Sequence, residues 1–206
     1  MGIKILIDEL TNHYTSNRGF AKKIRSIFPK AWIYSFEPLI ESFEKLNKKF
    51  ENDKRFFSFN IALTNNKGKM VFYENEHTGC SSLLEMGDLH KIAYPDSINM
   101  KKIVVPCDML DNVYDRLEIN GHILLKIDVQ GAEKNVLEGA EKFLSNVEII
   151  FCEINFNELY KGNVLFNELS QYLYDKGFKI EGVENVSQSL IDGSFLQADV
   201  YFKRIN

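Results

Sequence analysis

Short apolar runs alternate along this chain with segments in which apolar residues recur every three or four positions. Runs rich in β-branched and aromatic residues are typical of strands. They predict strands over 3–7, 32–36, 56–63, 102–107, 122–128 and 147–154. Helical spacing of apolar residues predicts helices over 19–28, 39–50, 109–117, 132–144 and 165–176. This alternation predicts an α/β fold with a doubly wound, mostly parallel sheet and right-handed crossovers.

The connections add detail to this picture. Two apolar runs over 178–183 and 195–202 flank a polar turn, so we expect a C-terminal antiparallel strand pair at the edge of the sheet. The turn-forming residues 65–68 predict a hairpin between the runs 56–63 and 69–73. From 74 to 100 the pattern is lost, as it is in lids and binding loops. No repeat or change of composition divides residues 1–206, which predicts a single domain.

Composition narrows the classes of function. The 206 residues are 45% hydrophobic and 26% charged, which is typical of a globular domain with a sizeable core. The formal net charge of −4 gives no reason to expect nucleic acid or an anionic membrane as a partner. The sequence contains neither a signal peptide nor an apolar stretch of transmembrane length. We therefore expect a cytoplasmic protein without membrane insertion, and an oligomer is compatible with the sequence.

The cysteine and histidine patterns exclude two further kinds of site. Cys80, Cys107 and Cys152 are odd in number and lack a CxxC pair, which argues against a disulfide framework and favours a reducing compartment. The four histidines are scattered without the spacing of metal ligands, so we expect no metal site. A phosphate-binding GxxxxGK[ST] loop and a GxSxG serine-hydrolase motif are also missing from the sequence.

The most informative part of the sequence is the end of the predicted strand 122–128 and the residues that follow it. This strand ends at Asp128, and open α/β sheets bind their ligands at the carboxyl ends of their strands. Gln130 and Gly131 then supply polar groups and let the backbone approach a ligand. Asp128 could instead cap the following helix. For Glu133, which falls in the first helical turn, a structural role is favoured.

Other predicted strands also end in acidic residues, namely Asp8, Glu37 and Glu153. In a doubly wound sheet these ends converge on one crevice, which predicts a shared site. Glu37 lies 18 positions after Gly19, near the spacing at which an acidic residue binds a ribose hydroxyl, although it also precedes a helix whose dipole it would favour. Glu153 is either a site residue or the partner of a lysine. Lys126 either reaches the surface or contacts a site carboxylate.

Several motifs occur in the order seen in FkbM-type methyltransferases, which the sequence resembles from about residue 20 to residue 202. The motifs are Phe36-Glu37-Pro38-Leu39, Asn60-Ile61-Ala62-Leu63, Ser81-Ser82-Leu83-Leu84, Leu110-Asp111, the stretch 126–133 with its continuation 136–140, and 151–156 with Tyr160. The resemblance implies a class I methyltransferase fold, which is Rossmann-like, and S-adenosylmethionine as cofactor. It also implies O-methylation of a hydroxyl on a sugar, polysaccharide or natural product, so the expected partner is a small-molecule or glycan acceptor.

The resemblance assigns cofactor-binding roles as well. Glu37 would bind the ribose of the cofactor, and the segment with Asn60 and Ala62 would border the adenine. Asp128 and Gln130 would lie at the methionine end, near the transferred methyl group.

An alcohol acceptor also needs a base that takes its proton. We expect Asp128, Glu153 and His77 as candidates, in falling order of closeness to the methyl group. His77 lies in the segment 74–100, and histidine titrates near neutral pH. Most single histidines in loops are only solvated, so this is the weakest of the three assignments.

The sequence departs from the family at the turn after the first strand. The glycine-rich turn Asp-x-Gly-Ala-Asn-x-Gly is replaced by a longer segment from Asp8 to Gly19. We still expect Asp8 and Gly19 themselves to contact the cofactor. Glycines there let backbone N–H groups approach the ligand. The alternative is therefore a degenerate, non-catalytic binding or scaffold protein. A nicotinamide-dependent dehydrogenase would fit the fold and the Glu37 spacing, but the sequence has no GxGxxG motif.

Overall fold

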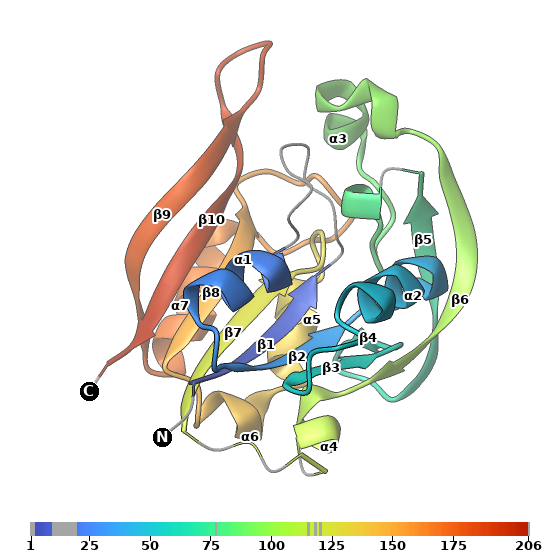
Figure 1. The fold of residues 1–206 in the computed structure, drawn as a ribbon. Coiled ribbons are helices and arrows are strands. Elements are labelled where there is room, and N and C mark those ends of the chain that lie inside the picture. Colours follow the sequence, from blue (N-terminus) through green and yellow to red (C-terminus); the bar gives the residue numbers. More distant parts are fainter. Residues whose placement is uncertain are drawn as a thin grey trace.

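A large mixed sheet forms the centre of the molecule. The computed structural model describes residues 3–9, 20–76, 78–114, 116, 117, 119 and 121–205. Within them the sheet has seven strands in the order β3-β2-β1-β7-β8-β10-β9 (Figure 1). The strands are β1 (Ile3–Glu9), β2 (Trp32–Phe36), β3 (Phe56–Phe59), β7 (His122–Asp128), β8 (Ile149–Asn155), β9 (Phe178–Gln188) and β10 (Phe195–Arg204). Neighbours from β3 to β8 are parallel, while β10 is antiparallel to β8 and β9. The predicted doubly wound sheet with a C-terminal antiparallel pair is confirmed.

The strand order reverses on either side of β1. The chain proceeds from β1 through β2 to β3 in one direction, and later from β7 to β8 in the other. Asp8 of β1 pairs with Phe36 of β2, and Glu9 pairs with Asp128 of β7. The carboxyl ends of β2 and β7 therefore flank the end of β1, which is the topological switch point where such sheets bind ligands.

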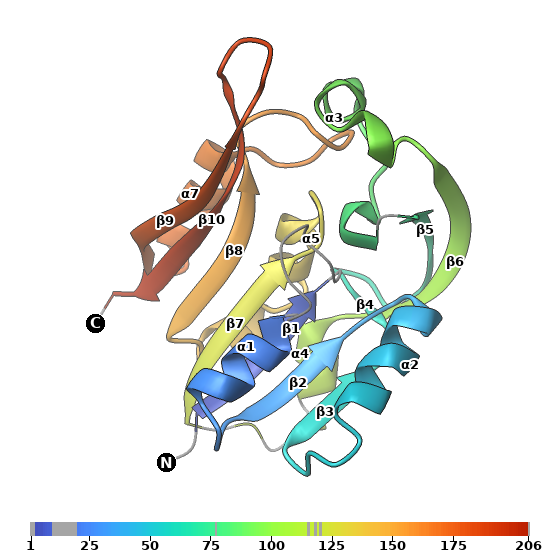
Figure 2. The same cartoon turned by 45° about the horizontal axis from the view of Figure 1, so that its top comes forward.

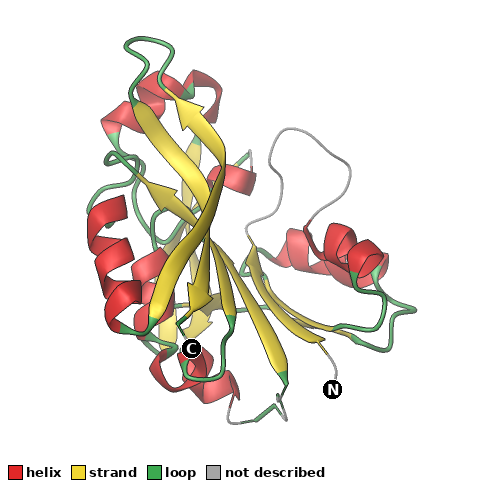
Figure 3. Cartoon of the chain, turned by 90° about the vertical axis from the view of Figure 1, so that its left-hand side faces the viewer, coloured by secondary structure: helices red, strands yellow, loops and turns green. Residues whose placement is uncertain are grey.

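Helices cover both faces of the large sheet (Figure 3). On one face lie α1 (Phe20–Ile27) and α2 (Ile40–Lys49), and on the other α4 (Leu110–Tyr114), α5 (Glu133–Glu138), α6 (Glu141–Leu144) and α7 (Phe166–Asp175). The alternation along β7 matches these two layers, because Leu125 and Ile127 pack in the core under α5–α7 while Leu124 packs with α1. No helix among the described residues is long and apolar enough to cross a membrane.

A smaller sheet, formed by residues 62–108, corrects two of the predictions. Its described strands are ordered β4-β6-β5, with β4 (Ala62–Leu63), β5 (Gly68–Asn75) and β6 (Met100–Asp108). The predicted strand 56–63 is wrong as one element, since β3 belongs to the large sheet and β4 to the small one. The predicted hairpin between 56–63 and 69–73 is also wrong, because β5 pairs with β6 over its whole length, whereas β4 offers only two residues.

The small sheet has its own apolar cluster, which explains why β5 pairs with β6. Phe72 of β5 and Val105 of β6 are buried against Leu39 and Ala62. Figures 1 and 2 show this sheet and the β9–β10 pair on opposite sides of the molecule.

The segment 74–100, which the sequence leaves without a pattern, contains short helices. They are η1 (Thr78–Cys80), α3 (Asp88–Ala93) and η2 (Pro95–Ser97). The predicted helix over 132–144 is split into α5 and α6 around Gly139. A Cβ atom on Gly139 would lie 2.1 Å from the backbone oxygen of Thr64, so this position accepts only glycine without a shift of the backbone. The break at Gly139 brings α5 and α6 close to Thr64, which directly follows β4.

Candidate active site

Three of the predicted site residues form one hydrogen-bonded network at the carboxyl ends of β7 and β8. The side-chain amide of Gln130 donates through Nε2 to Oδ1 of Asp128 at 2.9 Å and to Oε2 of Glu153 at 2.7 Å. All three side chains are buried. The structure therefore brings together Asp128, Gln130 and Glu153, although Glu153 lies on a different strand.

Tyr160 completes this network, and sequence reasoning gave it no role. Its hydroxyl donates to Oε1 of Gln130 at 2.8 Å. Burial raises the pKa of Tyr160 well above its ordinary value, so the hydroxyl keeps its proton and remains a donor. This bond orients the amide of Gln130. The amide oxygen faces Tyr160, and the amide NH₂ group faces the two carboxylates. The tyrosine was visible in the sequence as part of a family motif, but its spacing to Glu153 carries no recognisable signal.

Lys126 contacts site carboxylates and does not reach the surface. Its Nζ lies 3.2 Å from Oδ2 of Asp128 and 3.4 Å from Oδ1 of Asp199. The ammonium also stands 4.5 Å from the centroid of the Phe151 ring. A side chain that is only 4% exposed needs such partners, since an unpaired buried charge is strongly unfavourable.

Glu133 has the structural role that the sequence favours. Its Oε1 accepts hydrogen bonds from the backbone N–H groups of Gly131 at 2.9 Å and Val129 at 3.3 Å. It thereby holds the turn between β7 and α5. Burial, with a smaller contribution from the nearby carboxylate of Glu153, raises the pKa of Glu133 to about 8. At neutral pH this carboxyl is therefore mostly protonated.

Ser82 ties the segment 74–100 to the same turn. Its hydroxyl donates to the backbone oxygen of Gln130 at 2.7 Å and accepts from the backbone N–H of Leu84 at 2.9 Å. Its backbone also pairs with Tyr73 of β5. The sequence placed Ser82 in a family motif without a function, and the structure shows that it positions the Gln130 backbone.

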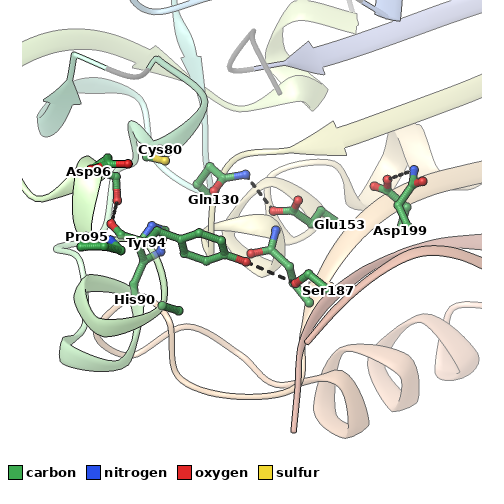
Figure 4. A pocket seen from close by; sticks show the side chains of 13 residues that line it. Cys80, His90, Tyr94, Pro95, Asp96, Gln130, Glu153, Ser187 and Asp199 are labelled. Carbon is green, nitrogen blue, oxygen red and sulfur yellow. Dashed lines mark hydrogen bonds between the residues drawn. The ribbon is translucent and has the colours of Figure 1, made fainter. Parts of the chain in front are cut away.

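A cavity of about 670 Å³ lies next to the network. Gln130 and Glu153 line it together with residues of the β9–β10 pair and of the α3–η2 segment (Figure 4). The lining residues are Cys80, His90, Ala93, Tyr94, Pro95, Asp96, Ser97, Gln130, Glu153, Asn185, Ser187, Gln197 and Asp199. Among these lining residues, all from the described part of the chain, three are carboxylates and none is lysine or arginine. The Tyr94 hydroxyl lies 3.3 Å from Oγ of Ser187, which links the two sides of the cavity.

The other predicted cofactor residues lie near the end of β2. Glu37 is buried, and its Oε1 accepts a hydrogen bond from the backbone N–H of Leu39 at 2.8 Å. Nδ2 of Asn60 donates to the backbone oxygens of Glu37 and Pro38, at 2.9 and 3.0 Å. Both side chains thus shape the turn before α2, and Ala62 packs in the core of the small sheet. Contact of these residues with a cofactor stays a prediction.

Three remaining assignments concern positions at the edge of what the structure describes. The backbone of Asp8 lies in β1 between Phe36 and Ile127. Gly19 and His77 lie outside the described residues. Their roles therefore also stay predictions.

Comparison with known proteins adds independent findings. The family model described as Methyltransferase FkbM domain matches residues 12–180. The 2-O-methyltransferase NoeI of Sinorhizobium fredii is 24% identical over 150 residues, which cover 70% of this chain and 62% of NoeI. The crystal structure of a methyltransferase FkbM from Methylobacillus flagellatus KT matches with a TM-score of 0.53 and 12% identity, over 88% of this chain and 39% of that one. The chain thus spans less than two thirds of either relative, and the structural match shows a class I methyltransferase-like fold.

Proposed function

Because the chain belongs to the FkbM methyltransferase family, we propose that it methylates a hydroxyl group of a sugar, polysaccharide or similar polyol, with S-adenosylmethionine as the methyl donor. The observation that carries the proposal is the network around Gln130. It joins Asp128, at the switch point of the sheet, to Glu153, in the wall of a cavity large enough for a sugar ring.

The chemistry of the described residues fits the cofactor of this family. Asp128 ends β7 and Glu37 directly follows β2, the two strands that flank β1, so acidic groups stand on both sides of the switch point. In this proposal the carboxylate of Glu37 accepts hydrogen bonds from the ribose hydroxyls, and Asp128 with Gln130 borders the methionine end. When bound, S-adenosylmethionine supplies a methyl group on a positively charged sulfur that an oxygen nucleophile can displace in line.

Glu153 is the base in this proposal, ahead of Asp128. The Asp128 carboxylate contacts Lys126 and Gln130, and Asp128 is not among the residues that line the cavity, whereas Glu153 is. A base must lie within hydrogen-bond reach of the proton it takes, so its position in the cavity wall supports Glu153. Gln130 holds Glu153 in place through the bond to Oε2.

The charge of the cavity supports an uncharged acceptor. Asp96, Glu153 and Asp199 are the charged groups among its described lining residues, and Lys126 pairs with Asp199, so the excess of carboxylates disfavours a phosphate group or another anion. Amide and hydroxyl side chains, such as Gln197 and Ser187, offer the hydrogen bonds that a polyol requires. This lining favours a glycan acceptor over RNA, in agreement with the net charge of −4. The 2-O-methyltransferase activity in the name of NoeI supports oxygen as the methylated atom.

The alternative of a non-catalytic binding or scaffold protein has less support. It depends on the altered segment from Asp8 to Gly19, most of which lies outside the described residues. The hydrogen-bonded arrangement of Asp128, Gln130 and Glu153 beside a cavity supports a catalytic role over a scaffold role. Family membership also leaves no basis for the dehydrogenase alternative.

The test combines binding and turnover. Calorimetric titration with S-adenosylmethionine and S-adenosylhomocysteine should show binding, and labelled methyl groups should pass to methyl glycosides of neutral hexoses. Glu153→Gln should lower kcat by about 10²–10⁴-fold while the affinity for S-adenosylhomocysteine stays the same. Glu148→Gln is the matched control, because Glu148 directly precedes the first residue of β8 and is half-exposed. This variant should leave kcat unchanged. Absence of binding by the folded protein would exclude the donor, and full activity of Glu153→Gln would exclude that base.

A further inference from the structure

His90 is a buried polar side chain to which the proposed function gives no role. It lies in α3, is only 2% exposed and lines the cavity. Neither Nδ1 nor Nε2 has a hydrogen-bond partner among the described residues. Buried polar atoms in native proteins nearly always have a partner, so two orphaned nitrogens on one ring call for a ligand or a structural explanation.

Aromatic neighbours fix the position of the His90 ring. Its centroid lies 4.9 Å from the Tyr94 ring and 4.9 Å from the Tyr160 ring, at interplanar angles of 57° and 67°. Tyr160 in turn bonds to Gln130, the centre of the site network. Figure 4 shows His90 and Tyr94 on the α3 side of the cavity, with Gln130 and Glu153 coming from the ends of β7 and β8. The imidazole is therefore held in the wall of the cavity that Glu153 also lines.

The protonation state determines what the ring can bind. Burial lowers the pKa of His90 to about 4, so the imidazole is neutral at physiological pH. A neutral imidazole presents one N–H donor and one acceptor nitrogen. A hydroxyl group, which both donates and accepts, matches this pair of atoms.

We propose that His90 is an acceptor-binding residue, whose ring nitrogens hydrogen-bond to hydroxyl groups of the polyol that is methylated beside Glu153. This inference rests on the proposed function. The structural alternative is a core histidine whose nitrogens contact trapped water and only support the packing of Tyr94 and Tyr160.

Replacement of His90 by phenylalanine separates these explanations. The variant His90→Phe keeps an aromatic ring between the tyrosines and removes both nitrogens. If the nitrogens serve a ligand, an apolar ring should leave the melting temperature of the free protein unchanged or raise it, because unsatisfied polar atoms disappear. The Michaelis constant for a methyl glycoside should rise at least tenfold, while the affinity for S-adenosylhomocysteine stays within twofold. His122→Phe, at the exposed start of β7, is the control and should leave both constants unchanged.

A second measurement does not depend on turnover. The ring ¹⁵N signals of His90 can be assigned because they are missing from the spectrum of His90→Phe. They should shift when methyl β-D-glucopyranoside or another methyl glycoside of a neutral hexose is added. A shift of the His90 signals without methyl transfer would support glycoside binding by His90 and contradict the proposed methyl transfer. Transfer by the wild type with no shift, or with an unchanged Michaelis constant in His90→Phe, would overturn the inference alone. A lower melting temperature of His90→Phe with unchanged glycoside binding would assign the nitrogens to structure.

Discussion

The buried carboxyl of Glu133 makes stability depend on pH in a way that one substitution should remove. The variant Glu133→Gln replaces a titratable group by a neutral one of nearly the same shape. Glutamine keeps a side-chain oxygen that can accept from the backbone N–H groups of Val129 and Gly131. The substitution therefore changes the ionisation and largely preserves the turn.

The size of the effect follows from the pKa of Glu133, which burial raises from 4.5 to about 8. Between these values the folded state holds a proton that the unfolded state has lost. The free energy of unfolding then falls as pH rises, by about 1.4 kcal/mol for each pH unit. Over the whole interval the wild type loses about 5 kcal/mol from this group. Below pH 4.5 both states are protonated, and above pH 8 both are ionised, so the loss stops at either end.

Urea unfolding of both proteins from pH 4 to pH 9.5, followed by circular dichroism, measures this difference. The free energy of unfolding of Glu133→Gln minus that of the wild type should increase between pH 4.5 and 8 and be flat outside that range. Glu138→Gln, an exposed change on the same helix, is the control and should show no such trend. A difference that stays constant across pH would show that Glu133 does not retain its proton in the folded state.

Two further substitutions test the network from other sides. Tyr160→Phe removes the donor to Oε1 of Gln130, and we expect the free energy of unfolding in urea to fall by about 1 kcal/mol. We also expect a lower kcat at unchanged affinity for S-adenosylhomocysteine. An unchanged kcat would show that the amide of Gln130 does not need this hydrogen bond. Lys126→Met leaves the buried Asp128 without the ammonium, and we expect a loss of about 3–5 kcal/mol in urea unfolding at pH 7. An unchanged stability would show that the ammonium does not compensate the buried carboxylate.

Much of the site could be predicted because parallel strands bring their carboxyl ends to one edge of a sheet. Asp128 and Glu153 each follow a buried apolar run, and β7 and β8 are neighbours, so both carboxylates come within reach of the amide of Gln130. The choice between the alternatives for Lys126 needed the structure, since its direction depends on which face of β7 it occupies. It shares a face with Leu124, on the side of α1, and reaches Asp199 from β10 there.

Other parts of the fold and site lie beyond local pattern. Pairing of β5 with β6 joins residues about thirty positions apart, and a turn sequence at 65–68 favours the wrong partner because it reports only on neighbours. His90 enters the site from the short helix α3 and Tyr160 from the connection after β8, and no periodicity in the sequence fixes which way these two side chains point. Their burial and their contact with one another are tertiary properties.

The backbone of Gln130 links these observations to the proposed catalysis. Its φ of 55° lies in the left-handed region, which costs a residue other than glycine about 1–2 kcal/mol. Glycine would relieve this strain, yet only a side-chain amide can accept from Tyr160 while donating to Asp128 and Glu153. Ser82 fixes the carbonyl of Gln130, and Glu133 fixes the N–H groups on either side of it. The strain is thus held by bonds from three separate segments. Under the proposed function it would fix Glu153 as the base before an acceptor arrives, which is how preorganised sites lower a barrier.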